Sequence, residues 1–212
     1  MTTALSDDVL EEAASRGETL IIHDLLRLIE RFDTGPGVPD TRLDAYLSAL
    51  GDNRFNEQAL RDGLEKRLTD SETWVEESAV YRLNGEISAF PPRWHEDLVG
   101  ESDLTQYVAT MTAAVEGGSA GYDHGGHGEG VPEKLLCDTA TVFSGTSYKD
   151  AMREAARLRD ANLLTADADQ HPNARIQLTP AGAERLGIDP ESAVAVDTNS
   201  ERERKKDPRI DE

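Results

Sequence analysis

Apolar residues recur three and four positions apart along most of the chain, which is the pattern of amphipathic helices. In residues 18–32 the stripe comprises Leu20, Ile21, Leu25, Leu28, Ile29 and Phe32. Similar stripes predict helices over residues 5–15, 41–51, 56–68, 102–115, 132–143 and 146–164. Ser6 is a typical N-cap residue for the first of these helices, and Thr146 or Ser147 would cap the last. The chain is therefore expected to be mostly helical.

The period changes from helical to extended in two places. Residues 73–90 are rich in β-forming residues, and Asn84–Gly85 within them is a strong signal for a two-residue hairpin. Residues 163–187 show the pattern of strand, turn, strand and short helix, with the turn around 169–173. We expect a mostly α fold with small β-hairpins, an α+β class.

The order of these elements predicts two similar units. Three helices followed by a β-hairpin are expected over residues 18–95, and a shorter version of the same plan over 131–188. An acidic helix within residues 1–17 would precede the first unit. A helix and a loop with seven Gly in residues 116–132 would connect the units within 96–130. The tail, 189–212, has no apolar periodicity and is expected to be disordered.

The end of the second unit resembles a known family. A helix ending in "NLL", a polar hairpin and the run "ARIQLTPAGAERLG" are similar to the wing of small winged-helix regulators, over residues 145–188. In that family the last strand commonly ends in Leu-Thr-x-x-Gly and starts a helix. The resemblance implies two winged-helix-like units that bind DNA or protein. Between residues 132 and 163, however, there is room for two helices where the family has three.

Composition indicates the environment in which the protein works. The chain carries 42 acidic and 22 basic residues, a net charge of −20. At molar salt the Debye length falls to about 3 Å, so the repulsion between surface carboxylates is screened. The composition resembles that of haloarchaeal proteins. We find no signal peptide pattern and no apolar run that approaches the roughly 20 residues of a membrane span. A cytoplasmic location is expected.

Three basic residues suggest a DNA-binding surface. Lys149, Arg153 and Arg157 are spaced by four, opposite the apolar stripe of their helix. In the winged-helix family the equivalent helix enters the major groove, and Arg175 on the wing would touch phosphate. Residues 131–188 carry seven basic and eight acidic side chains, against ten and twenty-six in residues 1–130. The alternative is an ordinary solvated face on which acidic neighbours pair with the cations.

The Gly-rich loop contains a possible metal site. His124 and His127 are accompanied by Asp123 and Glu129, and imidazole and carboxylate ligands suit zinc or nickel. The alternative is a solvated loop, because a Gly run lacks the rigidity of an established metal site. Otherwise no cofactor is expected. Cys137 lies in an apolar run and is expected to be a buried structural thiol.

No phosphate loop, nucleophile elbow, zinc-protease motif or dinucleotide fingerprint occurs, so a non-enzymatic protein is expected. Three hypotheses remain. The first is a DNA-binding protein in transcription regulation or another DNA transaction. The others are a protein–protein adaptor and a metal-responsive regulator; a homodimer formed through residues 102–115 is possible. The DNA hypothesis requires an antiparallel strand pair within 163–180. It also requires that the cations be neither buried nor neutralised by neighbouring acids.

Overall fold

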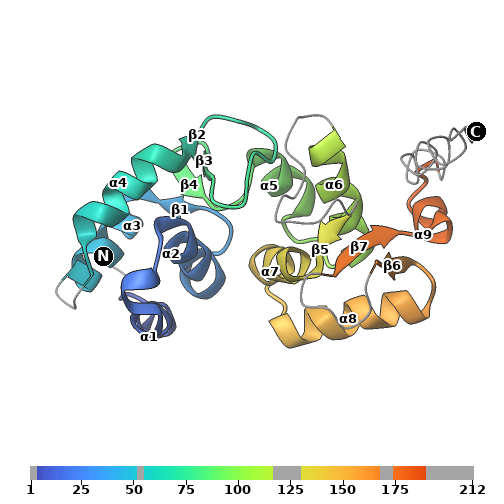
Figure 1. The fold of residues 1–212 in the computed structure, drawn as a ribbon, viewed down its shortest axis with the longest axis horizontal. Coiled ribbons are helices and arrows are strands. Elements are labelled where there is room, and N and C mark those ends of the chain that lie inside the picture. The colour runs from blue at the N-terminus through green and yellow to red at the C-terminus, as the bar shows by residue number, and fades with distance from the viewer. Residues whose placement is uncertain (1–3, 52–54, 117–129, 168–173, 190–212) are drawn as a thin grey trace, which may run out of the picture.

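The computed structural model describes residues 4–51, 55–116, 130–167 and 174–189. These residues form two halves that lie side by side (Figure 1). Each half consists of helices with one small sheet, so the α+β class expected from the sequence is confirmed. Among the described residues, no helix is long and apolar enough to span a bilayer.

The first half contains five α-helices and a four-stranded sheet among the described residues. Its elements are α1 (Asp7–Arg16), α2 (Ile22–Ile29), β1 (Val38–Pro39), α3 (Asp40–Gly51), α4 (Glu57–Arg67), β2 (Leu68–Thr69), β3 (Val80–Arg82), β4 (Glu86–Ser88) and α5 (Pro92–Leu98). The strand order is β1-β4-β3-β2; β4 is antiparallel to both its neighbours, and β2 is parallel to β3. The predicted hairpin at Asn84–Gly85 is confirmed, and Gly85 has a φ of +85°.

The second half repeats the order from α2 onward, without a counterpart of β2, and has a three-stranded sheet. Its elements are α6 (Leu104–Glu116), β5 (Val131–Pro132), α7 (Glu133–Phe143), α8 (Tyr148–Asp160), β6 (Leu164–Ala166), β7 (Arg175–Leu178) and α9 (Pro180–Arg185). The strand order is β5-β7-β6, and both pairs are antiparallel. The antiparallel pair expected within residues 163–180 is therefore present. Helix α6 packs against α7, α8, β5 and β7, so three helices precede the β6–β7 ribbon.

The same short sequence precedes helix α3 of the first half and helix α7 of the second. Gly37-Val38-Pro39 precedes Asp40, and Gly130-Val131-Pro132 precedes Glu133. Both glycines have positive φ, +92° and +102°, and a Cβ on Gly130 would lie 2.7 Å from the carbonyl oxygen of Ile176. In each copy the valine and proline form a two-residue strand that pairs with the last strand of the hairpin. The two halves thus share a sequence signal as well as an element order.

The single helix expected over residues 18–32 is wrong. A 3₁₀ turn (Gly17–Thr19) precedes α2, and a π-helical turn, η2 (Glu30–Thr34), follows it. The wide turn coincides with the burial of Glu30, which is 1% exposed. Its carboxylate accepts hydrogen bonds from the amides of Gly37 and Ala89, at 3.0 and 3.2 Å, and from the Ser88 hydroxyl. A buried acid at the junction of α2 and η2 therefore ties this helix to β1 and β4, two adjacent strands of the first sheet.

Aromatic side chains join the two halves into one continuous core. Trp74 and Trp94 stack with their ring centroids 5.2 Å apart. Phe143, at the end of α7, contacts Phe90 edge-on at 5.4 Å and His95 at 4.9 Å. Aromatic residues bury large apolar areas, so this cluster fixes the second half against the first.

The Leu-Thr-x-x-Gly motif of the resemblance has a clear local role. The Thr179 hydroxyl accepts a hydrogen bond from the Gly182 amide at 3.0 Å and caps α9. A Cβ on Gly182 would lie 2.1 Å from the carbonyl oxygen of Leu163, so a larger residue does not fit. The motif holds α9 close to the start of β6.

Candidate interaction surface

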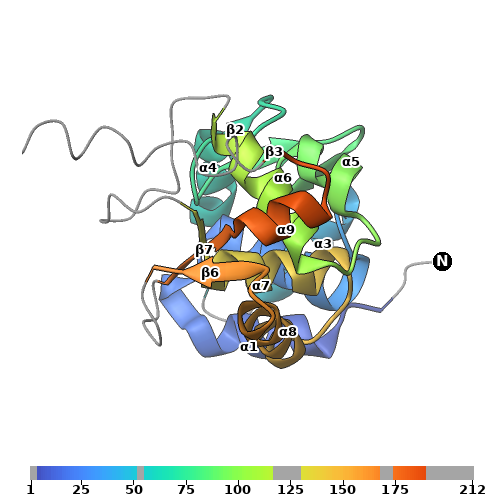
Figure 2. The ribbon, with the colours of Figure 1, turned by 90° about the vertical axis from the view of Figure 1, so that its right-hand side faces the viewer.

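Helix α8 presents one long face to solvent. Ser147 caps it, with its hydroxyl accepting from the Asp150 amide at 3.1 Å. Ala151, Ala155 and Leu158 are buried against the rest of the second half. Figures 1 and 2 both show α8 at the outer edge of the molecule, beyond α7 and the β6–β7 ribbon. The opposite face of α8 is therefore accessible to a macromolecular partner.

The three cations predicted from the sequence lie on this face. Lys149, Arg153 and Arg157 are all exposed. Arg153 pairs with Asp150 at 2.8 Å, and Arg157 makes a bidentate pair with Glu154, its Nε lying 2.7 Å from one carboxylate oxygen. Lys149 makes no ion pair with any residue that the structure describes. Two of the three cations are thus matched by acids of their own helix.

These acids remain charged. The Ser147 hydroxyl and the Arg153 guanidinium lower the pKa of Asp150, and the Arg157 guanidinium lowers the pKa of Glu154. Low pKa values keep both carboxylates ionised at neutral pH. Together with Asp160, which is also exposed on this helix, they equal in number the three cations of this face. The outer face of α8 carries little net charge.

An apolar side chain borders this balanced face, three residues after Lys149. Met152 is 44% exposed, one of the few large apolar residues in the described part of the chain with that much accessible surface. The remaining arginine of the helix, Arg159, turns toward α7 and pairs with Glu133 at 2.9 Å. We define the α8 face as Lys149, Met152, Arg153 and Arg157 with their paired acids.

Arg175 does not lie on this surface. The side chain is 8% exposed, and its Nη1 donates to the Gly130 carbonyl oxygen at 3.3 Å. Because the guanidinium is turned inward along the β5–β7 edge, it is poorly placed to touch a phosphate. The expected contact of Arg175 with phosphate does not fit this burial, and Arg175 is left out of the α8 face.

The proposed metal ligands fall outside the described residues. His124 and His127, like the rest of residues 117–129, are not among them, and neither is the tail from 190 to 212. Within the residues that are described, no group of three or more His, Cys, Asp and Glu side chains is arranged to hold a metal ion. Cys137 is buried as predicted, and burial raises the pKa of its thiol to about 12.

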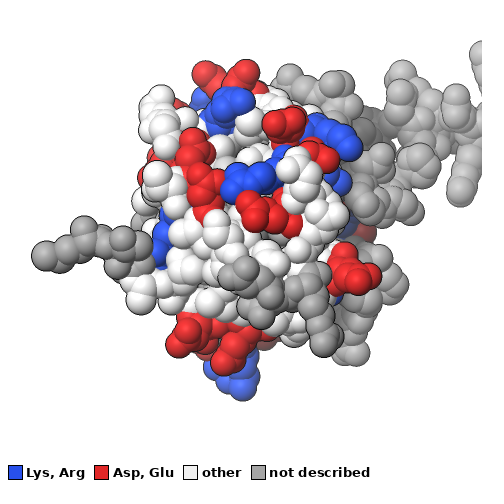
Figure 3. Space-filling view, turned by 90° about the vertical axis from the view of Figure 1, so that its left-hand side faces the viewer, with Lys and Arg blue, Asp and Glu red and all other residues white. Residues whose placement is uncertain are grey.

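The corresponding helix of the first half, α4, mixes charges in the same way. Arg61 pairs with Asp44 at 2.7 Å and with Glu57 at 2.9 Å. Figure 3 shows that Lys and Arg on this side of the molecule are interspersed with Asp and Glu. Neither α4 nor α8 therefore forms a continuous positive surface of the kind that follows a phosphate backbone.

A serine and a histidine meet in the first half in an arrangement that resembles a nucleophile with its base. Ser88 Oγ lies 2.8 Å from His95 Nε2 and donates to the Glu30 carboxylate. Ser88, however, is 0% exposed, and its hydroxyl also accepts from the Phe90 amide at 2.9 Å. A substrate has no access to this oxygen, so the three groups form a structural hydrogen-bond network.

The structure also brings together a basic groove that the sequence did not predict. Arg16, Arg27 and Arg31 from the first half face Lys134 from α7 across a cavity of about 80 Å³. Asp24 and Asp138 line the same cavity. The spacing of Arg27 and Arg31 by four was visible in the sequence, but the approach of Lys134 depends on how the halves pack. We call these six residues the inter-half groove.

Comparison with protein-family models, curated proteins and solved structures finds no match to this chain.

Proposed function

We propose that this protein is a protein–protein adaptor built from two winged-helix units, working inside a cell adapted to high salt. The helix, short strand, two helices and hairpin of each half support the winged-helix assignment, as does pairing of the short strand with the last strand of the hairpin. Winged helices serve as docking modules as well as DNA readers. The choice between these roles depends on the chemistry of the α8 face.

The observation that carries the proposal is the charge balance around Met152. Arg153 pairs with Asp150 and Arg157 with Glu154. A DNA backbone that approached these two guanidinium groups would therefore also approach two carboxylates. Protein interfaces, by contrast, are enriched in Met and Arg and tolerate paired charges. The net charge of −20 adds a repulsion toward the long, continuously charged backbone of a duplex. A protein surface suits the α8 face better than a duplex does.

DNA binding is the second candidate, and Lys149 favours it. This residue is exposed near the N-terminus of α8, where the recognition helix of a winged helix contacts the major groove, and it has no ion pair among the described residues. The pairs of Arg153 and Arg157 are exposed, and such pairs contribute only about 0–1 kcal/mol. A strong site on DNA would therefore be able to replace them.

The test compares variants of the α8 face in two assays, both in molar KCl. The full chain, crosslinked in a lysate of its own cells, is expected to recover a defined partner. Met152→Asp should abolish that recovery, because it replaces the exposed apolar side chain of the proposed interface by a charge. Val99→Asp is the matched control, since Val99 is 58% exposed on the loop after α5 and should behave like the parent.

The second assay measures binding to genomic DNA fragments by gel shift. The adaptor hypothesis predicts that the parent and the triple variant Lys149→Glu, Arg153→Glu, Arg157→Glu both leave DNA unshifted. A shift by the parent that the triple variant loses would establish the DNA candidate instead. Partner recovery that is equal for Met152→Asp and the parent would rule out the α8 face as the docking surface.

A further inference from the structure

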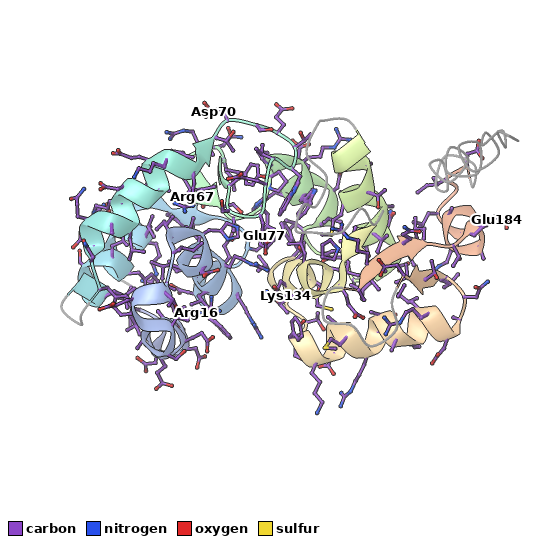
Figure 4. The ribbon with its side chains drawn as sticks, in the orientation of Figure 1. Arg16, Arg67, Asp70, Glu77, Lys134 and Glu184 are labelled. Atoms are coloured by element: carbon purple, nitrogen blue, oxygen red, sulfur yellow. The ribbon has the colours of Figure 1, made fainter. Side chains whose placement is uncertain are left out.

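The inter-half groove is a positive site on a strongly negative chain. It lies between α1 and α2 of the first half and α7 of the second; Figure 4 labels Arg16 and Lys134 on its two sides. Four cations and two carboxylates line it, an excess of two positive charges, whereas the whole chain has a net charge of −20. This local reversal of charge requires an explanation.

Internal ion pairs account for only part of the charge. Asp138 is shared by two cations, Arg27 and Lys134, the latter at 2.9 Å. Asp24 pairs with Arg16 at 3.3 Å, and Glu12, outside the groove, adds a long contact to Arg16 at 3.5 Å. Each lining acid is therefore already engaged by the cations around it.

Arg31 is the cation without a carboxylate. Its guanidinium lies 4.7 Å from the centroid of the Phe32 ring, and within the described part of the chain it makes no ion pair. The guanidinium is exposed, whereas Arg27 beside it is only 15% exposed and bound to Asp138. Arg31 and Lys134, which is 65% exposed, are thus the two groups best able to receive an incoming anion.

The size and lining of the groove favour an acidic peptide over a duplex. About 80 Å³ has room for one anionic group, and Leu28, Thr141 and Val142 offer apolar atoms for the methylenes of a Glu side chain. Arginine binds carboxylates in a planar, bidentate manner. A duplex presents a rigid row of phosphates, of which the groove admits one, whereas a flexible peptide can place a single side chain in the cavity.

We propose that the inter-half groove binds an acidic segment of the adaptor's protein partner, with Arg31 and Lys134 receiving its Asp or Glu side chains. This inference rests on the proposed adaptor function and adds to it the chemistry of the partner. The groove is contributed by both halves, so binding there also requires that the two halves keep their relative positions. Ligand sites commonly lie at such junctions between structural units.

Fluorescence anisotropy with a fluorescein-labelled octaglutamate peptide tests the proposal, using the full chain at 0.2 M KCl. Arg31→Glu, Lys134→Glu should weaken binding about tenfold or more, because it replaces two attractive charges by two repulsive ones. The matched control is Arg82→Glu, Arg93→Glu, which changes the net charge equally at exposed residues outside both the groove and the α8 face and should alter binding less than about twofold. The neutral pair Arg31→Gln, Lys134→Gln should also weaken binding. Because it adds no negative charge beside Asp138, its loss of binding would not be explained by misfolding that such a charge causes.

Three results would overturn the inference. These are an octaglutamate peptide that the parent does not bind, an equal loss in both charge-matched variants, or a labelled 20-base-pair duplex that binds through Arg31 and Lys134 more tightly than the peptide does. Failure here is distinct from failure of the adaptor function. If recovery of a partner depends on Met152 but not on Arg31 and Lys134, the adaptor function is supported and the groove is excluded as a binding site for that partner.

Discussion

Glu30 allows a quantitative test of the fold, through the substitution Glu30→Gln. Its carboxylate is buried and takes hydrogen bonds from two backbone amides and from Ser88. Burial raises its pKa from 4.5 to about 7, against the opposing effect of these hydrogen bonds and of the Arg27 charge. Because the folded state holds the proton to higher pH than the unfolded state does, stability is lost as the pH rises from about 4.5 through 7.

The magnitude follows from the two pKa values. A difference of one pKa unit corresponds to about 1.4 kcal/mol, so Glu30 should reduce the free energy of unfolding by about 2–3 kcal/mol between pH 5 and pH 8. Glutamine cannot ionise and removes this dependence. Its amide nitrogen would face the Ala89 N–H where a carboxylate oxygen now accepts, which costs about 1–2 kcal/mol at every pH.

Urea unfolding of the parent and of Glu30→Gln, at fixed KCl from pH 5 to pH 8, provides the measurement. The difference between the two proteins isolates Glu30, because His23 and His95 are present in both. Burial lowers the pKa values of these histidines to about 3 and 4, so they contribute the opposite slope, with stability lost as the pH falls below 6.5. We expect the variant to have the smaller free energy of unfolding at pH 5. By pH 8 the parent should have lost part or all of this advantage. A difference that stays constant across this range would refute the reasoning.

Three further substitutions or reagents test the packing. Gly182→Ala should cost about 1–3 kcal/mol by forcing a methyl group against the Leu163 carbonyl, whereas Ala181→Ser on the exposed side should change urea stability little. Phe143→Ala should lower stability by about 3–5 kcal/mol in calorimetry, because it empties the contact between the halves; two separate transitions in the parent would contradict that contact. Ellman's reagent should label Cys137 only at the rate of unfolding, and rapid labelling of the native protein would contradict its burial.

Features that depend on local chemistry were predictable from the sequence. The hairpin at Asn84–Gly85 follows from the need for a positive φ at the turn, and Thr179 and Gly182 meet a local need for a cap and for close packing. The helices follow from their apolar stripes, as α8 does from Ala151, Ala155 and Leu158. In these places a few neighbouring residues determine the conformation without help from the rest of the chain.

Features that depend on distant contacts were not predictable in the same way. Strands β1 and β5 have two residues each, too few for any periodicity, although the repeated Gly-Val-Pro marks both of them. The π-helical turn after α2 coincides with a buried acid whose partners, Ser88 and Ala89, lie about 60 residues away. The packing of α6 against the second half was not predictable either. The Gly-rich segment separates α6 from β5 in the sequence and interrupts the apolar periodicity between them.

The α8 face illustrates the same limit within the candidate site. The spacing by four placed Lys149, Arg153 and Arg157 on one exposed side correctly. Spacing alone did not determine whether Asp150 and Glu154, each three residues before an arginine, would point to solvent or pair with it. Pairs at this separation contribute only a few tenths of a kcal/mol, so a sequence pattern cannot decide between the two states. That choice distinguishes a phosphate-facing helix from a balanced protein interface.

Salt dependence tests the premise that the acidity is an adaptation to a high-salt cell. Lowering KCl from 2 M to 0.1 M lengthens the Debye distance from below about 3 Å to about 10 Å, so carboxylates across the surface repel one another. Exposed pairs such as Arg153–Asp150 strengthen at the same time, but each by less than about 1 kcal/mol. With an excess of twenty negative charges, repulsion should dominate and lower the melting temperature by about 5 °C or more. Thermal unfolding followed by circular dichroism measures the sign directly. A melting temperature that rises on dilution of the salt would mean that attractive pairs outweigh repulsion, and the acidic surface would then need a basic partner as its explanation.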